Sequence, residues 1–279
     1  MMAALLQQSI WRVIDQSSLG TNFDGKQSFA IDDVLCESVG SGNSPATARL
    51  WTHDRTIILG IQDTRLPHLR HGLRVLQAAG YRCIVRNSGG LAVVLDPGVL
   101  NLSLIFSEKE RPLSIDEAYQ AMAVFIEKLL LNYHLKAETG EIVHSYCPGR
   151  YDLSCGGRKF AGISQRRAKK GVAVQIYLCV SGSGSERAEL VRQFYQAGIG
   201  GEATVFTYPD IDPASMASLE ELCEKKLTIS QLSADILKLL QSFGTLNTAP
   251  LTEMESRAFG FYYERIIRRN EKVFDCPDD

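Results

Sequence analysis

Some segments of this chain show the hydrophobic period typical of helices, and others show the period typical of strands. The clearest helical period covers residues 114–133, where apolar side chains recur every three or four positions. Ser114, with Glu117 three residues later, is the signature of an N-terminal capping box. The same period predicts further helices over 27–39, 67–79, 185–193, 214–223 and 229–243.

Short apolar runs bounded by turn residues predict strands between these helices. They cover residues 46–51, 56–61, 81–86, 91–95, 99–106, 141–145, 152–155, 158–165 and 172–180. Strands and helices do not alternate strictly along the chain. This order favours an α+β fold with a mixed, mainly antiparallel sheet flanked by helices, followed by a C-terminal helical extension.

The two ends of the chain carry weaker patterns than its middle. Residues 1–26 are predicted to be an irregular lead-in, and residues 251–279 a C-terminal tail. Between them, residues 27–250 are predicted to form one domain that includes the C-terminal helices. A chain of 279 residues with 45% hydrophobic residues can bury the core of one such large domain.

Charge and hydropathy exclude several classes of protein. The net charge is -2 and acidic and basic residues are interspersed, unlike the basic stripe of a nucleic-acid binder. The longest basic run, 166–170, predicts a solvated turn. The first ten residues do not resemble a signal peptide, and no stretch approaches the ~18 consecutive apolar residues of a membrane span. We therefore expect a cytoplasmic protein that binds neither nucleic acid nor membrane.

The seven cysteines are scattered and include no Cys-x-x-Cys pair, so the sequence predicts no metal site. Cys83 and Cys179 lie in strand-like runs and are expected to be buried structural residues. Cys147 differs, because it lies in a polar, turn-rich segment directly before Pro148 and Gly149. This setting singles it out as a candidate reactive residue.

A Gly-Gly turn at 156–157 separates Cys147 from Lys159. Because a hairpin returns the chain on itself, these two side chains are predicted to be neighbours. A lysine near a thiol favours the thiolate, which is the nucleophile that covalent acyl transfer needs. The alternative is a plain surface hairpin, and the spacing alone does not decide between the two.

Other residues near Cys147 and upstream of it offer rival or supporting roles. His144 is a second candidate for the general base, although no Asn or Asp that would orient it is identifiable. Cys155 lies directly before the hairpin glycines and has no expected role. The motif Arg-Asn-Ser-Gly-Gly at 86–90 can bring backbone close to a ligand, although it also suits a tight hairpin turn.

Three segments in order carry a resemblance to a known superfamily. The pattern Arg-x-Ser-Gly-Gly-x-Ala-Val-x-x-Asp-x-Gly-x-x-Asn-x-Ser at 86–103 resembles the lipoate/biotin protein ligases and octanoyltransferases. The segment Gly-Arg-Lys-Phe-Ala-Gly-Ile-Ser-Gln at 157–165 resembles the lysine motif of that superfamily. The segment Ser-Tyr-Cys-Pro-Gly-Arg-Tyr-Asp-Leu at 145–153 is similar to the branch that transfers octanoyl groups from glycine cleavage H protein to other proteins.

The resemblance implies a biotin/lipoate protein ligase-like catalytic domain and an acyltransferase activity in lipoate biosynthesis. The donor would be the octanoyl- or lipoyl-lysine of glycine cleavage H protein, and the acceptors the lipoyl domains of 2-oxoacid dehydrogenase complexes. The acyl group would pass through a thioester on Cys147, with Lys159 favouring the thiolate. The expected substrate-binding residues are Arg86, Ser88, Gly89, Gly90 and Gly162.

One departure from the superfamily pattern bears on the cofactor. ATP-dependent ligases of the superfamily carry a glycine and a histidine where this chain has Leu91 and Leu95, so we expect no cofactor and no ATP. Three alternatives stay open from the sequence. They are a transferase that takes octanoate from acyl carrier protein, an ATP-dependent lipoate ligase, and a non-catalytic module that docks lipoyl domains.

Overall fold

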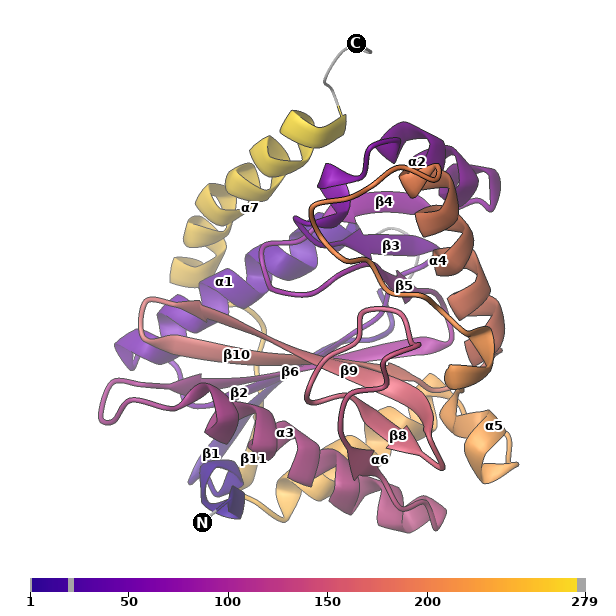
Figure 1. Ribbon diagram of the computed structural model, residues 1–279. Coiled ribbons are helices and arrows are strands. Elements are labelled where there is room, and N and C mark those ends of the chain that lie inside the picture. Colours follow the sequence, from indigo (N-terminus) through magenta and orange to yellow (C-terminus); the bar gives the residue numbers. More distant parts are fainter. Residues whose placement is uncertain (1, 20–22, 275–279) are drawn as a thin grey trace.

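A large mixed sheet forms the centre of the molecule (Figure 1). The structure is a computed structural model and describes residues 2–19 and 23–274. Within these residues the sheet has eight strands. In spatial order they are β11 (Thr245–Thr248), β1 (Ile10–Gln16), β2 (Thr47–Trp51), β6 (Val99–Ser107), β10 (Gly171–Cys179), β9 (Arg158–Ala168), β8 (Leu153–Cys155) and β7 (Glu138–Thr139).

The pairing within this sheet confirms the predicted mixed, mainly antiparallel character. Strand β1 pairs in parallel with β11 and with β2. All other neighbours in the sheet, from β2 through β6, β10, β9 and β8 to β7, pair antiparallel.

A second, smaller sheet lies beside the first, in the order β4 (Arg82–Val85), β3 (Thr56–Leu59) and β5 (Val93–Leu95). Strand β3 pairs in parallel with β4 and antiparallel with β5. Strands β2 and β3 therefore do not form a hairpin across residues 53–55, because each belongs to a different sheet. Helices α2 (Leu69–Ala78) and α4 (Gly184–Ile199) pack against each other and against this small sheet.

Helices cover both faces of the large sheet (Figure 1). Helix α1 (Gly25–Ser41) packs on β6, β9 and β10, and the long helix α7 (Glu253–Phe274) lies along α1. Helix α3 (Ile115–Leu130) packs on the opposite face together with α6 (Ile229–Gln241). The short α5 (Leu219–Cys223) precedes α6. The predicted capping box of Ser114 and Glu117 is confirmed at the start of α3.

The alternation of side chains along β10 separates the core on one face of the sheet from two cores on the other face, and Ala173 belongs to the core beneath α1. Val174 and Leu178 point into the core shared with α3, where they meet residues such as Phe125. Tyr177 and Cys179 point the other way, into the core shared with the small sheet. The large sheet thus presents one face to α3 and α6 and leaves part of its other face to a ligand cavity.

Three sequence predictions about the chain ends and one loop are wrong. The lead-in predicted as irregular over 1–26 contains β1, which lies inside the large sheet between β11 and β2. Residues 141–145 form no strand, and the only pairing in that neighbourhood of the described chain is β7 with β8. The tail predicted over 251–279 is largely the helix α7, whose last described residue is Phe274.

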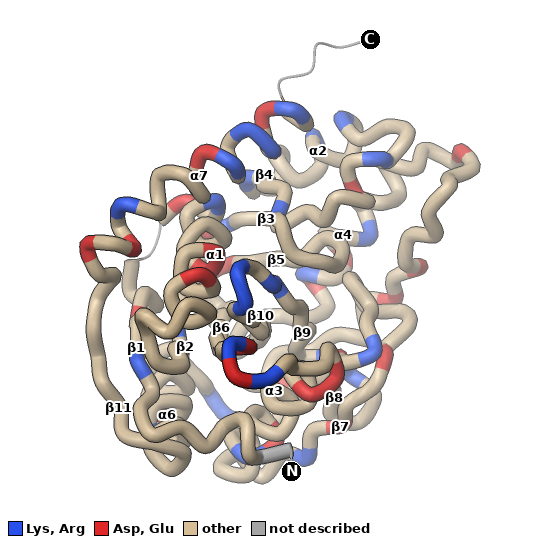
Figure 2. Tube along the Cα trace, turned by 90° about the vertical axis from the view of Figure 1, so that its left-hand side faces the viewer, with Lys and Arg blue, Asp and Glu red and all other residues tan. Residues whose placement is uncertain are grey.

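Charged residues of both signs are spread over the surface, as Figure 2 shows along α7. In the basic run 166–170, Lys169 and Lys170 form the exposed turn between β9 and β10, as predicted. Arg166 and Arg167 instead lie half-buried and bind acidic side chains. Within residues 2–19 and 23–274, no helix is both long enough and apolar enough to cross a membrane.

Candidate active site

A row of side chains across four strands, with two residues of a second row, forms the base of a cavity. The first row is Trp51, Asn101, Tyr177 and Gly162, which pair in register across β2, β6, β10 and β9. In the second row, Gln175 and Ser164 face the same cavity. The small sheet covers the cavity with Ile58, Val93 and Leu95.

The cavity has a polar end and an apolar end. Its volume of about 250 Å³ is close to the lower limit of ordinary small-ligand pockets. Cys147, Arg86 and Asp152 line one part of it. The remaining wall is mainly apolar and includes Phe29, Trp51, Ile58, Val93 and Leu95. Such a shape suits a ligand with one reactive polar group and a hydrocarbon chain.

The Cys147 thiol lies between the two sequence motifs that were predicted to meet. The residue has a φ of 48°, in the left-handed region, within the loop that joins β7 to β8. Its Sγ accepts the backbone N–H of Leu91 at 3.1 Å and lies 3.5 Å from Nη2 of Arg86. The loop after β4 therefore supplies both an N–H group and a cation to a sulfur that lies 61 residues from Arg86 along the chain.

Gly90 explains how the loop can approach so closely. It has a φ of 108°, and a Cβ at this position would lie 2.2 Å from Arg86 Nη2 and 3.0 Å from Cys147 Sγ. A side chain here would therefore displace both the guanidinium and the thiol. Gly89 has open space around it, so its backbone is exposed toward the cavity that it lines.

Lys159 is fully buried and bound to the backbone of the Cys147 loop. Its Nζ donates to the carbonyl oxygen of Cys147 at 2.8 Å and to that of Tyr146 at 2.9 Å. It also forms an ion pair with Asp152 at 3.0 Å and lies 3.2 Å from Ser145 Oγ. The prediction that Cys147 and Lys159 are neighbours is therefore confirmed, but the contact is to the carbonyl oxygen of Cys147.

This arrangement corrects the expected source of the charge at the thiol. The ammonium group of Lys159 is occupied by Asp152 and by two backbone carbonyl groups. The cation in contact with Sγ is the guanidinium of Arg86, which also donates to the carbonyl oxygen of Leu91 at 2.7 Å. Sequence reasoning assigned Arg86 to the substrate, because a contact between residues so far apart in the chain leaves no local pattern.

We predict that Arg86→Met slows alkylation of Cys147 by iodoacetamide at pH 7 by about tenfold, because it removes the cation that favours the thiolate. Lys159→Met should slow this alkylation less, since its charge faces Asp152. The control is Arg82→Met, which removes an exposed cation from β4. Equal rates for Arg86→Met and Arg82→Met would contradict the assignment.

The remaining predicted substrate-binding residues divide into two groups. Ser88 has a buried Oγ without a hydrogen-bond partner among the described residues, but it does not line the cavity. Gly162 lines the cavity, but its missing side chain makes room for protein. A Cβ there would lie 2.7 Å from Cε1 of Tyr177. The space that Gly162 leaves next to β10 is therefore occupied by the Tyr177 ring.

The rival residues lie away from the thiol. His144 is exposed, and its Nδ1 lies 2.9 Å from the carbonyl oxygen of Asp210. Cys155 is buried at the end of β8, and burial raises the pKa of its thiol. Among the described residues no group of three or more His, Cys, Asp or Glu side chains is arranged to hold a metal ion.

Asp152 and Tyr119 line the cavity, and sequence reasoning gave neither a role. Asp152 is buried, and this burial raises the pKa of its carboxyl although Lys159 acts in the opposite direction. Its place directly after Tyr151 in the cysteine motif was the one available signal. Tyr119 stacks on Tyr151, with ring centroids 4.6 Å apart.

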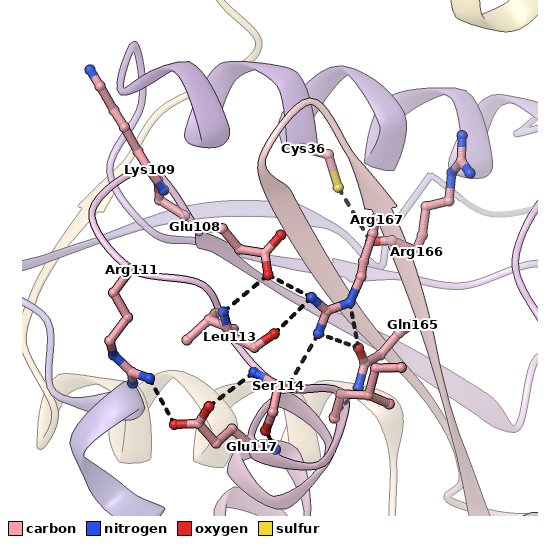
Figure 3. A network of polar contacts seen from close by, with 12 residues as sticks. Cys36, Glu108, Lys109, Arg111, Leu113, Ser114, Glu117, Gln165, Arg166 and Arg167 are labelled. Carbon is pink, nitrogen blue, oxygen red and sulfur yellow. Dashed lines mark hydrogen bonds and ion pairs between the residues drawn. The ribbon is translucent and has the colours of Figure 1, made fainter.

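A polar network holds the start of α3, which carries Tyr119, against β9 (Figure 3). Arg167 donates to Glu108 at 2.6 Å, to the carbonyl oxygen of Leu113 at 2.9 Å and to that of Ser114 at 3.1 Å. Gln165 Nε2 donates to the carbonyl oxygen of Ile115 at 2.6 Å. Gln165, the last residue of the lysine motif, and Arg167, two residues later, thus fix the helix that borders the cavity.

Comparison with known proteins identifies the family of the chain. Residues 24–241 match the family model described as the lipoyl protein ligase A/B catalytic domain. The chain is 56% identical over 274 residues to the octanoyl-GcvH:protein N-octanoyltransferase of Anoxybacillus flavithermus, covering 98% of this chain and 99% of the relative. It is 47% identical to the lipoyl-GcvH:protein N-lipoyltransferase of Listeria monocytogenes, covering 96% and 97% of the two chains.

Solved structures show the same fold at low sequence identity. A lipoate protein ligase of Thermoplasma acidophilum with bound lipoic acid superposes with a TM-score of 0.69 at 18% identity, covering 91% of this chain and 95% of that one. Lipoate-protein ligase A bound with ATP gives a TM-score of 0.70 at 17% identity, covering 92% and 95%. These likenesses confirm the predicted fold class.

Proposed function

The chain belongs to the lipoyl protein ligase A/B catalytic domain family, and from this premise we propose that it transfers octanoyl groups between proteins. The donor is the octanoyl-lysine of glycine cleavage H protein, the protein that the names of its relatives specify. The acceptors are the lysines of lipoyl domains in 2-oxoacid dehydrogenase complexes. A lipoyl group is a second candidate for the transferred acyl group, because the name of the Listeria relative specifies it.

The reaction that this site supports runs in two steps through a thioester on Cys147. In the first, Sγ attacks the carbonyl carbon of the octanoyl-lysine amide, the carbon–nitrogen bond breaks, and the donor lysine leaves with a proton. In the second, the amine of the acceptor lysine attacks the thioester, the carbon–sulfur bond breaks, and the amine loses a proton. Amide-to-thioester conversion is uphill and the second step returns that energy, so the exchange needs no ATP.

The observation that carries this proposal is the place of the Cys147 Sγ, between an N–H group and a guanidinium at the polar end of the cavity. We propose that Arg86, Gly89 and Gly90, which line the cavity, bind the acyl carbonyl end together with Ser88, whose buried Oγ has no partner among the described residues. Lys159 acts as a positioning residue, because it binds the carbonyl oxygen of Cys147. Leu95, where the ligases carry a histidine, belongs to the apolar wall that receives the hydrocarbon chain.

Intact-mass measurement of the purified chain tests the function. Incubation with octanoylated H protein, without ATP and with a chelator present, should add one octanoyl group to Cys147. Addition of a lipoyl domain should remove that group and add it to the domain. Octanoylation that requires free octanoate with Mg-ATP would support a ligase instead, and a donor requirement for octanoyl-acyl carrier protein would support the sibling transferase. Binding of lipoyl domains with no acyl-enzyme would indicate a docking module.

We also propose boundaries and a location for this activity. The catalytic domain comprises residues 27–250 together with β1, since β1 completes the large sheet. The helix α7 is joined to it through the buried ion pair of Arg12 with Glu255 at 2.7 Å. A cytoplasmic location agrees with scattered cysteines, which form no disulfide among the described residues.

Residues of the apolar wall should set the length of acyl chain that the protein prefers. Ile58 is buried on β3 and faces the cavity, so Ile58→Phe should shorten the space for the acyl chain. Each methylene excluded from the cavity forfeits about 0.8 kcal/mol of burial, or roughly fourfold in kcat/KM. We expect octanoyl transfer to fall while hexanoyl transfer is retained. Ile57→Phe is the matched control, because Ile57 is equally buried but does not line the cavity. The same change of preference in both variants would contradict the assignment.

A further inference from the structure

The hydroxyl of Tyr177 is a buried polar group that the cavity leaves unpaired. The residue is 6% exposed, and its hydroxyl oxygen has no hydrogen-bond partner among the described residues. A buried hydroxyl without a partner is less favourable than one that is hydrogen-bonded, because it has lost its water without gaining a replacement. Native proteins keep few such groups, and those beside a ligand cavity point to a ligand.

The position of Tyr177 in the cavity indicates which part of a ligand it meets. In the row Trp51, Asn101, Tyr177 and Gly162, Tyr177 lies next to Gly162, and Trp51 lies at the opposite end, two strands farther. Gly162 belongs to β9, the strand that also carries Lys159. The Tyr177 ring stacks on that of Tyr146, the residue directly before Cys147, with centroids 5.8 Å apart. Tyr177 thus lies toward the thiol, away from the apolar end.

The surroundings keep this hydroxyl available as a donor. Burial, with nearby Tyr146, Cys179, Asp152 and Cys147, raises the pKa of Tyr177 well above its usual value. The phenol is therefore protonated throughout the physiological range. Gly162 leaves its approach open, because a Cβ at that position would lie 3.2 Å from the hydroxyl oxygen.

From these observations we propose that the Tyr177 hydroxyl donates a hydrogen bond to the carbonyl oxygen of the acyl group that Cys147 receives. The inference rests on the proposed acyl transfer and adds a catalytic residue to it. When Sγ attacks, the carbonyl double bond shifts its electrons onto oxygen, and that oxygen gains negative charge. A donor fixed in a water-poor cavity stabilises this charge more than it stabilises the neutral carbonyl group.

Tyr177→Phe tests the proposal, because it removes one oxygen atom and leaves the ring in place. The probe is the octanoyl thioester of N-acetylcysteamine, and the readout is the rate at which intact mass records octanoyl-Cys147 at saturating thioester. We expect this rate to fall by about 10²-fold, the effect of losing one oxyanion donor. Alkylation of Cys147 by iodoacetamide should be unchanged, since the sulfur there displaces iodide at a methylene carbon and no carbonyl oxygen gains negative charge.

Tyr208→Phe is the matched control. Tyr208 lies in the same core as Tyr177, but its hydroxyl donates to the carbonyl oxygen of Gln62 at 2.8 Å and does not line the cavity. Removing that satisfied hydroxyl should lower Tm and leave acylation at the rate of the unchanged protein. Tyr177→Phe should instead slow acylation and keep or raise Tm, because its hydroxyl has no partner among the described residues to lose.

Three results would overturn the proposal. Acylation of Tyr177→Phe at the unchanged rate would show that the hydroxyl does not act. A parallel loss of Tm, alkylation and acylation would show that its role is structural. A loss that differs between hexanoyl, octanoyl and decanoyl thioesters would show that it contacts the chain. If the unchanged protein itself forms no acyl-enzyme, the proposed acyl transfer fails, and that outcome is separate from all three.

Discussion

Cys147→Ala should abolish octanoyl transfer, with a loss of kcat on the order of 10³-fold or more, as expected when a covalent nucleophile is removed. The reason is geometric, since the Sγ lies at the polar end of the acyl cavity and accepts the Leu91 N–H at 3.1 Å. The substitution removes one atom from a half-buried loop residue, so Tm should change little. Intact mass should show no octanoyl adduct on the variant.

Cys155→Ser is the control for Cys147→Ala, because it removes a nearby thiol that is not the proposed nucleophile. Cys155 ends β8 in the core beside α3 and does not line the cavity. We expect its replacement to cost some stability, because it places a hydroxyl in an apolar site, and to leave the acyl-enzyme in place. Transfer at the unchanged rate by Cys147→Ala, or loss of the adduct in Cys155→Ser, would refute the assigned nucleophile.

The parts of this site that sequence reasoning found are those that local pattern encodes. Cys147 has a turn-rich setting, and Lys159 follows it across a two-glycine turn, so a hairpin argument brought them together. The contacts that Arg86 and Tyr177 make in the site were not predicted, for a different reason. The contact of Arg86 with Sγ requires two loops to meet, and Tyr177 sits in an apolar strand where its hydroxyl gives no periodic signal.

The prediction of the fold succeeded where apolar residues recur with a clear period. It failed where charged residues interrupt that period. Strand β1 contains Arg12, a residue that argues against a central strand in isolation. The structure accommodates Arg12 because Glu255, 243 residues later, binds it bidentately at 2.7 and 2.8 Å. Helix α7, which carries Glu255, is mostly polar, and the residues that it buries are Glu255, Tyr262, Ile266 and Asn270, so few apolar residues mark it in the sequence. Neither β1 nor α7 could be predicted alone, because the charged residue that each of them buries is explained only by its partner on the other.

Lys159→Met should be the most destabilising of the substitutions considered for this site. It leaves Asp152 buried without the ammonium group that pairs with it at 3.0 Å, and breaking a buried pair from one side costs about 3–5 kcal/mol. It also frees the carbonyl oxygens of Tyr146 and Cys147, which hold the nucleophile's loop. Urea unfolding should report the stability loss, and octanoyl transfer should fall with it.

The double variant Lys159→Met with Asp152→Asn distinguishes a charge effect from a packing effect. It removes the buried carboxylate together with the lysine, so it should be more stable than Lys159→Met alone. Because the carbonyl oxygens of the Cys147 loop still lack their donor, transfer should stay low even where stability returns. Equal instability in the single and double variants would mean that lost packing, and not the unpaired carboxylate, sets the cost.

The pH dependence of the Lys159→Met variant should follow from Asp152. Burial already raises the pKa of this carboxyl above 3.8, and the lysine that opposes this rise is gone in the variant. A carboxyl whose pKa is higher in the folded protein favours folding below its unfolded pKa, and this advantage is lost as pH rises through the folded pKa. The stability gap between wild type and Lys159→Met should therefore be widest at neutral pH and should narrow as pH falls toward the ordinary range of aspartate. Urea unfolding of both proteins across this interval measures the gap, and a gap that stays constant would show that Asp152 keeps its charge without the lysine.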